Sequence, residues 1–563
     1  MKPMASGAPP VGETTTTWSA RTTWAALGAV LVARLLYLAR YGWDIGWMNL
    51  GYLDHARQLA LGRAQASEEQ PLAFFALIAA RRLGLSALGA NQAVYLAAHL
   101  LLAAGAIAIA RFVWPAASRR RRTTFVATLA LLPLLASQSG RNNLGVTLAA
   151  GLSTGALGAA AAAAVGGRRA PALLAALLAA LAAMARYEAL VTCGGAALVL
   201  ALLAPCLPDL RAGRRAGAAL AIGALAGLAA VVAIRRALTG GGASSDPTYA
   251  FYTFFDGLPL LMYPHLPGTE YGRYRASAGY FGGFDANHGS LVHALVHHPG
   301  FALLRVVTKP VDLLLVLLWL YALTPVGLAL AAFGAARLGH PRRWGRGWLL
   351  AAYLLPAAML FVPQQNPAYY VSIAIPLVLA VARGADRLGD RLSATTGRAL
   401  GGATVVAAVV LITAAGKLSV TNSRTLNAAA HYLEARCSSG CLTNVLPQSL
   451  RDQAWVVTDA SAPLPPREDR NEHVVFGGLN AQNRDRYDFC NRVQRSRAAG
   501  FSGPVLWIDA DIQSFKVFDA DFDPEVRYQG TVDRRALVEE QRFSYAGDAV
   551  TISQLPADRR CRP

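Results

Sequence analysis

The sequence predicts a mainly α-helical, polytopic membrane protein with a small α/β domain at its C-terminal end. The 563 residues are 54% apolar, with a mean hydropathy of +0.34, which is high for a soluble chain of this size. The apolar residues gather in stretches close to the roughly 20 residues that a helix needs to cross a hydrocarbon core. Arginine clusters stand between these stretches, as is typical of membrane proteins.

About eleven membrane-spanning helices are predicted before residue 417. The first follows a polar, Thr-rich tail (1–22) that lacks a small-residue cleavage site, so we expect this helix to remain as an anchor. Several stretches are short, and some helices are therefore expected to be tilted, broken or buried in protein. The predicted spans are 23–41, 91–113, 123–140, 143–165, 170–185, 187–206, 216–237, 311–336, 348–363, 367–383 and 399–416.

The positive charges predict the orientation in a cytoplasmic membrane. With the N-terminus inside, nearly all arginine clusters fall in inside loops, as the positive-inside rule requires. The inside loops are then 114–122, 166–169, 207–215, 337–347 and 384–398. The outside segments are 42–90, 141–142, 238–310, 364–366 and the C-terminal segment 417–563. Topology thus accounts for the net charge of +20, and nucleic acid is not expected as a partner.

The C-terminal segment, 417–563, is predicted to be an extracytoplasmic α/β domain, and 23–416 the transmembrane domain. A helix is expected at 423–436, and strands are expected at 455–458, 473–476, 505–508 and 549–552. Four cysteines predict two disulfides with three possible pairings. The spacing of the first two also resembles half a zinc site, but no second pair has metal spacing. These cysteines are Cys437, Cys441, Cys490 and Cys561.

The first long outside loop, 42–90, is expected to form amphipathic helices that lie on the membrane. Apolar residues recur in it at helical spacing. They predict an apolar face on each of two helices. The first face consists of Tyr52, His55 and Leu59, and the second consists of Leu72, Phe75, Leu77 and Ile78.

Acidic residues in this loop are candidates for catalysis. Asp44 lies between Trp43 and Trp47, directly after the first span. Tryptophans are expected at the membrane interface, but a carboxylate is not. Asp44 could act as a general base toward an acceptor hydroxyl, or it could cap a helix. Asp54 is a rival on the polar face of a helix, and Glu69 could cap the next helix, bind a cation or hold substrate.

Two short turns carry ionisable residues close to apolar helices. Arg141 and Asn142 form the first turn, and Arg186, Tyr187 and Glu188 form the second. Ionisable groups in such places are costly and often functional. Arg186 could pair with Glu188, or it could bind a phosphate through the two-point geometry of a guanidinium.

The second long outside loop, 238–310, adds further candidates. Aromatic residues accompany its charged groups, a combination that suits sugar binding and also suits ordinary loop packing. No pair has decisive metal spacing. The charged and polar candidates are Asp246, Asp256, His265, Glu270, Arg273, Arg275, Asp285, His288, His293, His297 and His298.

Four short motifs, in order along this topology, resemble the GT-C membrane glycosyltransferases. The closest likeness is to the aminoarabinose-transferase and protein O-mannosyltransferase-like branch. The resemblance covers roughly residues 23–385. It rests on Asp44, on Glu69-Gln70-Pro71-Leu72, on Ser139-Gly140-Arg141-Asn142, and on Arg186-Tyr187-Glu188 within Ala-Arg-Tyr-Glu-Ala-Leu.

The resemblance implies a sugar donor linked to polyprenyl phosphate, no nucleotide, and a first-loop aspartate as base, here Asp44. The acceptor would be a glycan, lipid or protein. The chain departs from the family pattern at Ile45, where many relatives have Glu, and at Gln70, where some have Lys. The donor phosphate would then need another cation, for which Arg186, Arg273 and Arg275 are candidates. No metal ligands are predicted, and the need for a divalent cation stays open. The other residues of the expected site are Arg141, Asn142, Tyr187, Glu188 and His265.

Three other interpretations stay open. A transporter or flippase would use no covalent chemistry, although no internal repeat is visible. A non-catalytic envelope-glycan binding protein would explain the departures at Ile45 and Gln70. A third interpretation places chemistry in the C-terminal domain, where Asp509 and Asp511 could hold a metal on a nucleotide-sugar diphosphate.

Overall fold

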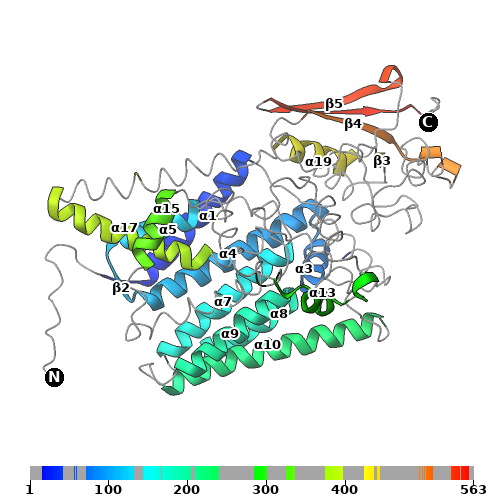
Figure 1. Cartoon of the computed structure of the whole chain (residues 1–563). Helices are drawn as coiled ribbons and strands as arrows, with labels where there is room; N and C mark the ends of the chain where they lie inside the picture. The colour runs from blue at the N-terminus through cyan, green and yellow to red at the C-terminus, as the bar shows by residue number, and fades with distance from the viewer. Residues whose placement is uncertain are drawn as a thin grey trace, which may run out of the picture.

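The computed structural model is a bundle of helices with a small sheet at one end (Figure 1). It describes residues 16–41, 56, 59, 71–131, 144–166, 168–203, 210–239, 285–288, 290–300, 303, 325–335, 374–396, 407, 424–436, 441–443, 493–494, 497–498, 500, 502–511, 534–545 and 547–556.

Apolar helices dominate these residues, so the predicted polytopic helical class is confirmed. Four described helices are long and apolar enough to cross a membrane: α1 (Ala20–Tyr41), α4 (Ala87–Val113), α7 (Leu144–Gly166) and α10 (Leu210–Thr239). Two shorter apolar helices are α8 (Arg169–Ala185) and α9 (Tyr187–Leu203). All six match predicted spans to within two turns. The predicted total of eleven spans stays a prediction.

The predicted boundaries of two helices were wrong, because both helices extend into predicted loops. Helix α17 (Ala374–Thr396) continues through most of the predicted inside loop 384–398. It can do so because Asp386, only 2% exposed, is paired there with Arg121. Helix α5 (Arg119–Leu131) begins inside the predicted loop 114–122. The hydroxyl of Ser118 accepts a hydrogen bond from the Arg121 backbone N–H at 3.0 Å and so caps this start.

The directions of the helices agree with the predicted alternation. Gly151 lies against Ala98, and Gly158 lies against Gly105, so α7 runs parallel to α4. Helix α8 runs antiparallel to α7, with Leu178 near Gly155 and Ala182 in one cluster with Leu148. Helix α10 is parallel to α8, because Gly223 lies against Ala176 and Gly227 against Ala180.

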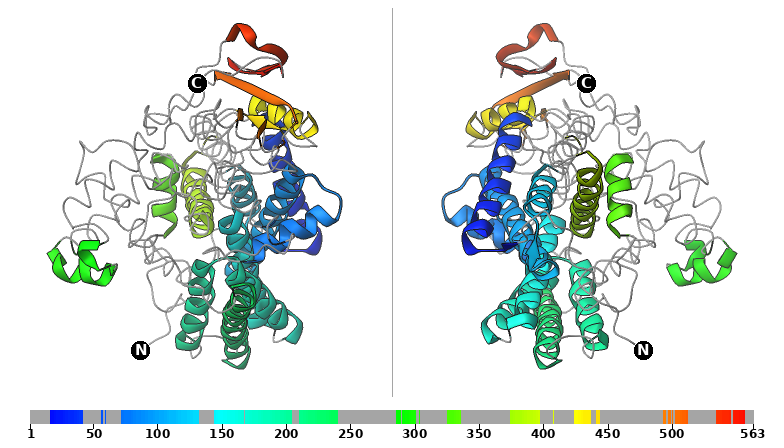
Figure 2. Two further views of the ribbon diagram at one scale, coloured as in Figure 1. Left: turned by 90° about the vertical axis from the view of Figure 1, so that its right-hand side faces the viewer. Right: turned by 90° about the vertical axis from the view of Figure 1, so that its left-hand side faces the viewer.

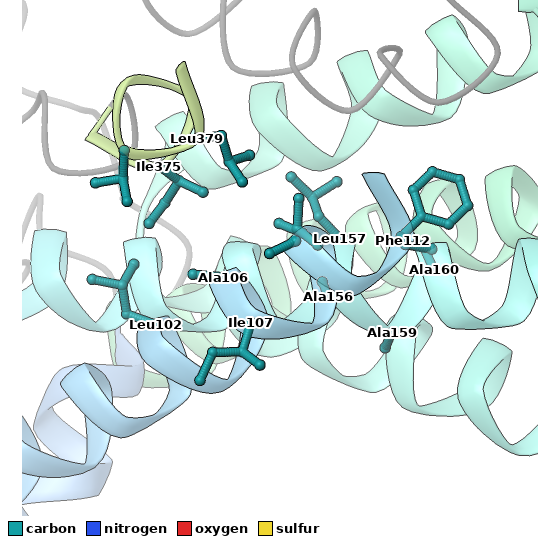
Figure 3. Close-up of a cluster of buried hydrophobic side chains, with 14 of the residues drawn as sticks. Leu102, Ala106, Ile107, Phe112, Ala156, Leu157, Ala159, Ala160, Ile375 and Leu379 are labelled. Carbon is teal, nitrogen blue, oxygen red and sulfur yellow. The ribbon is translucent and has the colours of Figure 1, made fainter. Parts of the chain in front are cut away.

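Glycine permits the close approach of α4 and α7. A Cβ built on Gly105 would lie 2.5 Å from the carbonyl oxygen of Thr154, and one on Gly151 would clash with the carbonyl oxygen of Ala98. Such small-residue contacts are typical of helices packed in membranes. Further along the same contact, apolar side chains of α4, α7 and α17 form the core shown in Figure 3, among them Ile107, Leu157 and Leu379.

We expect Gly151→Leu to destabilise the bundle by at least about 1–3 kcal/mol, the usual cost of forcing extra atoms into a packed core. The obstacle is backbone, which cannot rotate away. Thermal unfolding of the purified chain in detergent would measure the loss. Gly194→Leu is the matched control, because a Cβ there meets nothing within 4 Å. Equal melting temperatures for the two variants would contradict the close contact.

Three segments predicted to lie inside meet at one end of the bundle. Strand β1 (Thr16–Thr17) pairs antiparallel with β2 (Ala116–Ala117). Next to it, Ser118 donates to Asp386 at 2.6 Å, and Arg121 forms an ion pair with the same carboxylate. The N-terminal tail, the loop after α4 and the C-terminal half of α17 therefore share one end, as the topology requires.

The C-terminal domain contains a four-stranded sheet in the order β3-β4-β6-β5. The strands are β3 (Leu442–Thr443), β4 (Val505–Asp511), β5 (Val538–Tyr545) and β6 (Asp548–Gln554). Helix α19 (Arg424–Arg436) contacts β5 and β6. The predicted helix 423–436 and the strands at 505–508 and 549–552 are confirmed. Sequence reasoning missed β3 and β5, and the predicted strands 455–458 and 473–476 lie outside the described residues.

Side chains join α19 to the sheet. Arg436 forms two hydrogen bonds to Glu540, at 2.9 and 3.3 Å, and the Tyr432 hydroxyl donates to the same carboxylate at 3.1 Å. Burial and this hydrogen bond raise the pKa of Tyr432, and the bonds to Glu540 raise the pKa of Arg436. Cys441 is disulfide-bonded, as predicted for one of the four cysteines, and its partner stays a prediction.

The C-terminal domain lies beyond the end of the bundle at which α1 finishes (Figures 1 and 2). Arg40, in the last turn of α1, donates to the Tyr545 hydroxyl of β5. The Arg424 guanidinium lies over the same ring, 4.6 Å from its centroid. The domain is therefore fixed to the helix that leads into the loop of Asp44.

Candidate functional site

The turn between α8 and α9 holds an arginine–glutamate pair. Arg186 has extended backbone (φ −164°, ψ 151°), which ends α8, and α9 begins at Tyr187. Arg186 Nε lies 2.9 Å from Glu188 Oε2, and Nη2 lies 2.8 Å from Oε1. This two-point pair holds both groups in fixed directions. Of the two interpretations of Arg186, the local ion pair is confirmed.

The pair is partly open to solvent. The side chain of Arg186 is 21% exposed and that of Glu188 is 34% exposed. The Thr192 hydroxyl donates to the Glu188 backbone carbonyl at 2.9 Å, which stabilises the first turn of α9. A charged pair on a rigid, accessible turn is suited to contact a polar or anionic ligand, because it needs little reorganisation to do so.

The start of helix α3 (Pro71–Arg82) lies next to this turn. Leu72 packs against a cluster that includes Ala185 and Ala189, which flank the arginine–glutamate pair. Pro71 at the first helical position is buried, and proline is favoured there because its missing N–H would have no helical partner. The fold therefore brings the Pro-Leu part of one motif beside the Arg-Tyr-Glu motif.

A second cluster joins α3 to the first residue of α7. Leu144 is fully buried in it, together with Leu77 and Tyr95. Of the first-loop residues, Ala56 is buried there and Leu59 packs against it. The predicted faces are partly confirmed, since Leu77 is buried and Ile78 packs on the cluster. Phe75 is 38% exposed, and its neighbour Phe74 points into the cluster instead, because helix α3 turns Phe74 and Leu77 to the same side.

These parts converge at one end of the bundle. The start of α1 lies by the end of α4, as the β1–β2 pairing shows, so α1 finishes at the end where α4 begins. Helix α3 packs on the beginning of α4, and α7 begins at the same end. The last residue of α1, Tyr41, precedes Asp44 by three positions. The described residues that flank the four predicted motifs thus lie at a common end of the bundle.

Most of the predicted site residues lie outside the described residues. They are Asp44, Asp54, Glu69, Arg141, Asn142, His265, Arg273 and Arg275. Their roles remain predictions. Within the described part of the chain, no group of three His, Cys, Asp or Glu residues is arranged to hold a metal ion, and the question of a divalent cation stays open.

A histidine cluster lies in the described part of the second long outside loop. Helix α13 (Leu291–His297) carries His293 and His297, whose ring centroids lie 4.1 Å apart, and His288 lies 5.3 Å from His293. Asn287 is buried beside them, and its side-chain oxygen lies 3.4 Å from His293 Nδ1. Burial, and then repulsion from His297 and His288, lowers the pKa of His293.

We expect acid to loosen this segment. The pKa of His293 is lower in the folded segment than in the unfolded chain, so the unfolded chain binds a proton more readily. The folded segment therefore keeps its full stability above the unfolded pKa of about 6.5 and loses stability as the pH falls below that value. Hydrogen exchange of residues 285–300 should therefore accelerate, after correction for intrinsic rates, between pH 7.5 and 5.5. His297→Gln should reduce this response, and β5, which lacks histidine, serves as the internal control.

Sequence reasoning missed two buried ionisable residues in the spans. Arg34 on α1 is 4% exposed and His99 on α4 is 6% exposed. A usable signal was present, because each interrupts an otherwise apolar stretch, Leu-Val-Ala-Arg-Leu-Leu and Leu-Ala-Ala-His-Leu-Leu.

No protein-family model matches the chain, and no curated protein matches it. Among solved structures, the chain is similar to ArnT from Cupriavidus metallidurans bound to undecaprenyl phosphate, with a TM-score of 0.47 and 11% identity over 97% of this chain and 100% of that chain. It is also similar to the apo oligosaccharyltransferase of Archaeoglobus fulgidus, with a TM-score of 0.45 and 12% identity over 87% of this chain and 70% of that chain.

Both solved proteins are GT-C fold glycosyltransferases, the superfamily that the sequence motifs resemble. TM-scores of 0.45 and 0.47 at 11–12% identity describe a similarity of general arrangement.

Proposed function

We propose that this chain is a membrane glycosyltransferase that moves a sugar from a polyprenyl phosphate to an acceptor at the outer face of the cytoplasmic membrane. One observation carries the proposal. The Arg186–Glu188 turn, the start of α3 and the start of α7 meet at one end of the bundle, where α1 also leads toward Asp44. In this proposal the four motifs belong to one site.

The proposed reaction uses these groups in distinct roles. An acceptor hydroxyl loses its proton to Asp44, and its oxygen forms a bond to the anomeric carbon of the sugar. The bond from that carbon to the phosphate oxygen breaks, and the polyprenyl phosphate leaves with the electron pair. Arg186, with Arg273 or Arg275, stabilises the negative charge that develops on the phosphate.

The partly exposed glutamate supports a role for the turn in substrate positioning. Glu188 is held by Arg186 and is one-third exposed, so a sugar hydroxyl could donate to it. Asn142 and Tyr187 are proposed to contribute further hydrogen bonds to the substrate, as the resemblance implies. The C-terminal domain, joined to α1 through Arg40 and Tyr545, would cover the site or contact the acceptor.

A reconstitution experiment separates transfer from transport. The purified chain is placed in liposomes with a radiolabelled sugar on polyprenyl phosphate and with cell-envelope acceptors. A transferase releases free polyprenyl phosphate and labels the acceptor, whereas a flippase moves the intact donor across the bilayer. Donor that stays intact with every acceptor fraction would reject the proposal. Mass spectrometry of envelope glycans from a deletion strain would then identify the sugar and acceptor.

A further inference from the structure

Arg34 lies in the middle of the buried face of α1. Ala26, Val30, Arg34 and Leu38 follow at four-residue spacing and are each at most 7% exposed. Seven positions separate Arg34 from the end of the helix at Tyr41, which corresponds to about 10 Å along the axis. The guanidinium is therefore held inside the protein, well below the end of the span.

One of the two terminal nitrogens of the Arg34 guanidinium has a structural role. Its Nη2 donates to the carbonyl oxygen of Leu129 on α5 at 3.0 Å. In an α-helix that carbonyl would accept from the residue four positions later, which is Pro133 and has no N–H. Arg34 thus supplies the missing hydrogen bond.

The second terminal nitrogen of Arg34 has no structural role of this kind. Among the residues that the structure describes, Nη1 of Arg34 is buried without a hydrogen-bond partner, and so is Nε2 of His99 on α4. Helix α1 packs against both α4 and α5. It runs antiparallel to α4, and Ala26 and Val30 share one core cluster with Ala103 and Ala110. This packing puts Arg34 on the same stretch of the helix pair as His99, close enough for its charge to act on the imidazole. A buried polar atom without a partner is costly, and a buried charge without a partner is costlier still.

The surrounding helices supply no counter-charge. Helices α1, α4, α5 and α7 contain no aspartate or glutamate along their described lengths. A buried arginine is normally compensated by a carboxylate, a phosphate or backbone carbonyls. Here one carbonyl takes one donor, and the net positive charge remains.

We propose that Arg34 and His99 form an internal binding site for a phosphate-type oxyanion. An oxyanion offers several acceptor oxygens, which can accept from Arg34 Nη1 and from His99 Nε2–H at the same time. The anion is either the headgroup of a lipid phosphate or free inorganic phosphate. The site lies on α1 and α4 and does not depend on the proposed transfer reaction.

The test measures the melting temperature of the full chain in a maltoside detergent, which contains no phosphate. Wild type is titrated with inorganic phosphate, with undecaprenyl phosphate, and with undecaprenol or chloride as controls. Binding to the folded state raises the melting temperature in proportion to ligand occupancy. A response to inorganic phosphate and to the lipid phosphate identifies a general phosphate site, and a response to the lipid phosphate alone identifies the headgroup.

The variants test the residues. Arg34→Met should weaken phosphate binding by about 10–100-fold, the usual value of one or two charge-assisted hydrogen bonds, and His99→Leu should weaken it less. Arg21→Met, at the exposed start of the same helix, should bind like wild type. If Arg34→Met does not fold, Arg34→Lys and His99→Leu still report on the site. The proposal is overturned if phosphate never shifts the wild-type transition, if undecaprenol or chloride shifts it equally, or if the foldable variants respond like wild type.

Discussion

Asp44→Asn is expected to abolish sugar transfer while the amount of protein in the membrane stays unchanged. Asparagine keeps the size and polarity of the side chain but cannot accept the proton of an acceptor hydroxyl, and loss of a general base slows reactions by about 10²–10⁴-fold. Stability should not change, since Asp44 follows the end of α1 at Tyr41. Release of labelled sugar from the polyprenyl phosphate donor in purified membranes is the measurement.

Asp54→Asn is the matched control, because it makes the same change in the same loop. If Asp44 is the base, Asp54→Asn retains most of the activity. Full activity of Asp44→Asn, with loss in Asp54→Asn, would move the base to Asp54. A cysteine placed at 44 should also react with a membrane-impermeant thiol reagent added from outside, and labelling only from the cytoplasmic side would exclude both residues.

The sequence predicted the helices of the bundle well because their signal is strong. Stretches such as α4 and α10 are apolar along their whole length, and the lipid environment permits little other than a helix there. Arginine clusters then fixed the alternation, which the parallel contact of α4 with α7 bears out. Span ends were less predictable: α17 continues for three turns past the predicted boundary because Asp386 is neutralised by Arg121, a partner 265 residues away.

The C-terminal sheet and the buried polar site were harder to predict for related reasons. Strand β5, Val-Glu-Glu-Gln-Arg-Phe-Ser-Tyr, is mostly exposed and carries little apolar alternation, so its pairing with β6 decides its structure. Arg34 and His99 are single residues whose proximity depends on how α1 and α4 pack. In the candidate site, the sequence placed Arg186 beside Glu188, but only the side-chain geometry shows that the two residues form an ion pair. The phosphate role of Arg186 is compatible with this pair and stays a proposal.

Arg186→Gln is expected to reduce transfer by about 10²–10³-fold, the usual effect of removing one group that stabilises developing negative charge. Its effect on folding should be far smaller, at most about 1 kcal/mol, because the pair with Glu188 is partly exposed. The initial rate of transfer and the melting temperature therefore report on different roles of the same residue. Arg186→Lys, which keeps the charge but loses the two-point geometry, should recover part of the rate.

The double variant Arg186→Gln/Glu188→Gln decides whether the pair is catalytic or only structural. If the pair merely holds the turn, replacing both charges by amides of matching shape removes the unpaired charge that each single variant leaves, and transfer should return toward the wild-type rate. If Arg186 stabilises the departing phosphate, the double variant regains stability but stays slow. Recovery of the rate in the double variant would assign the phosphate to Arg273 or Arg275 and leave the α8–α9 turn as scaffold.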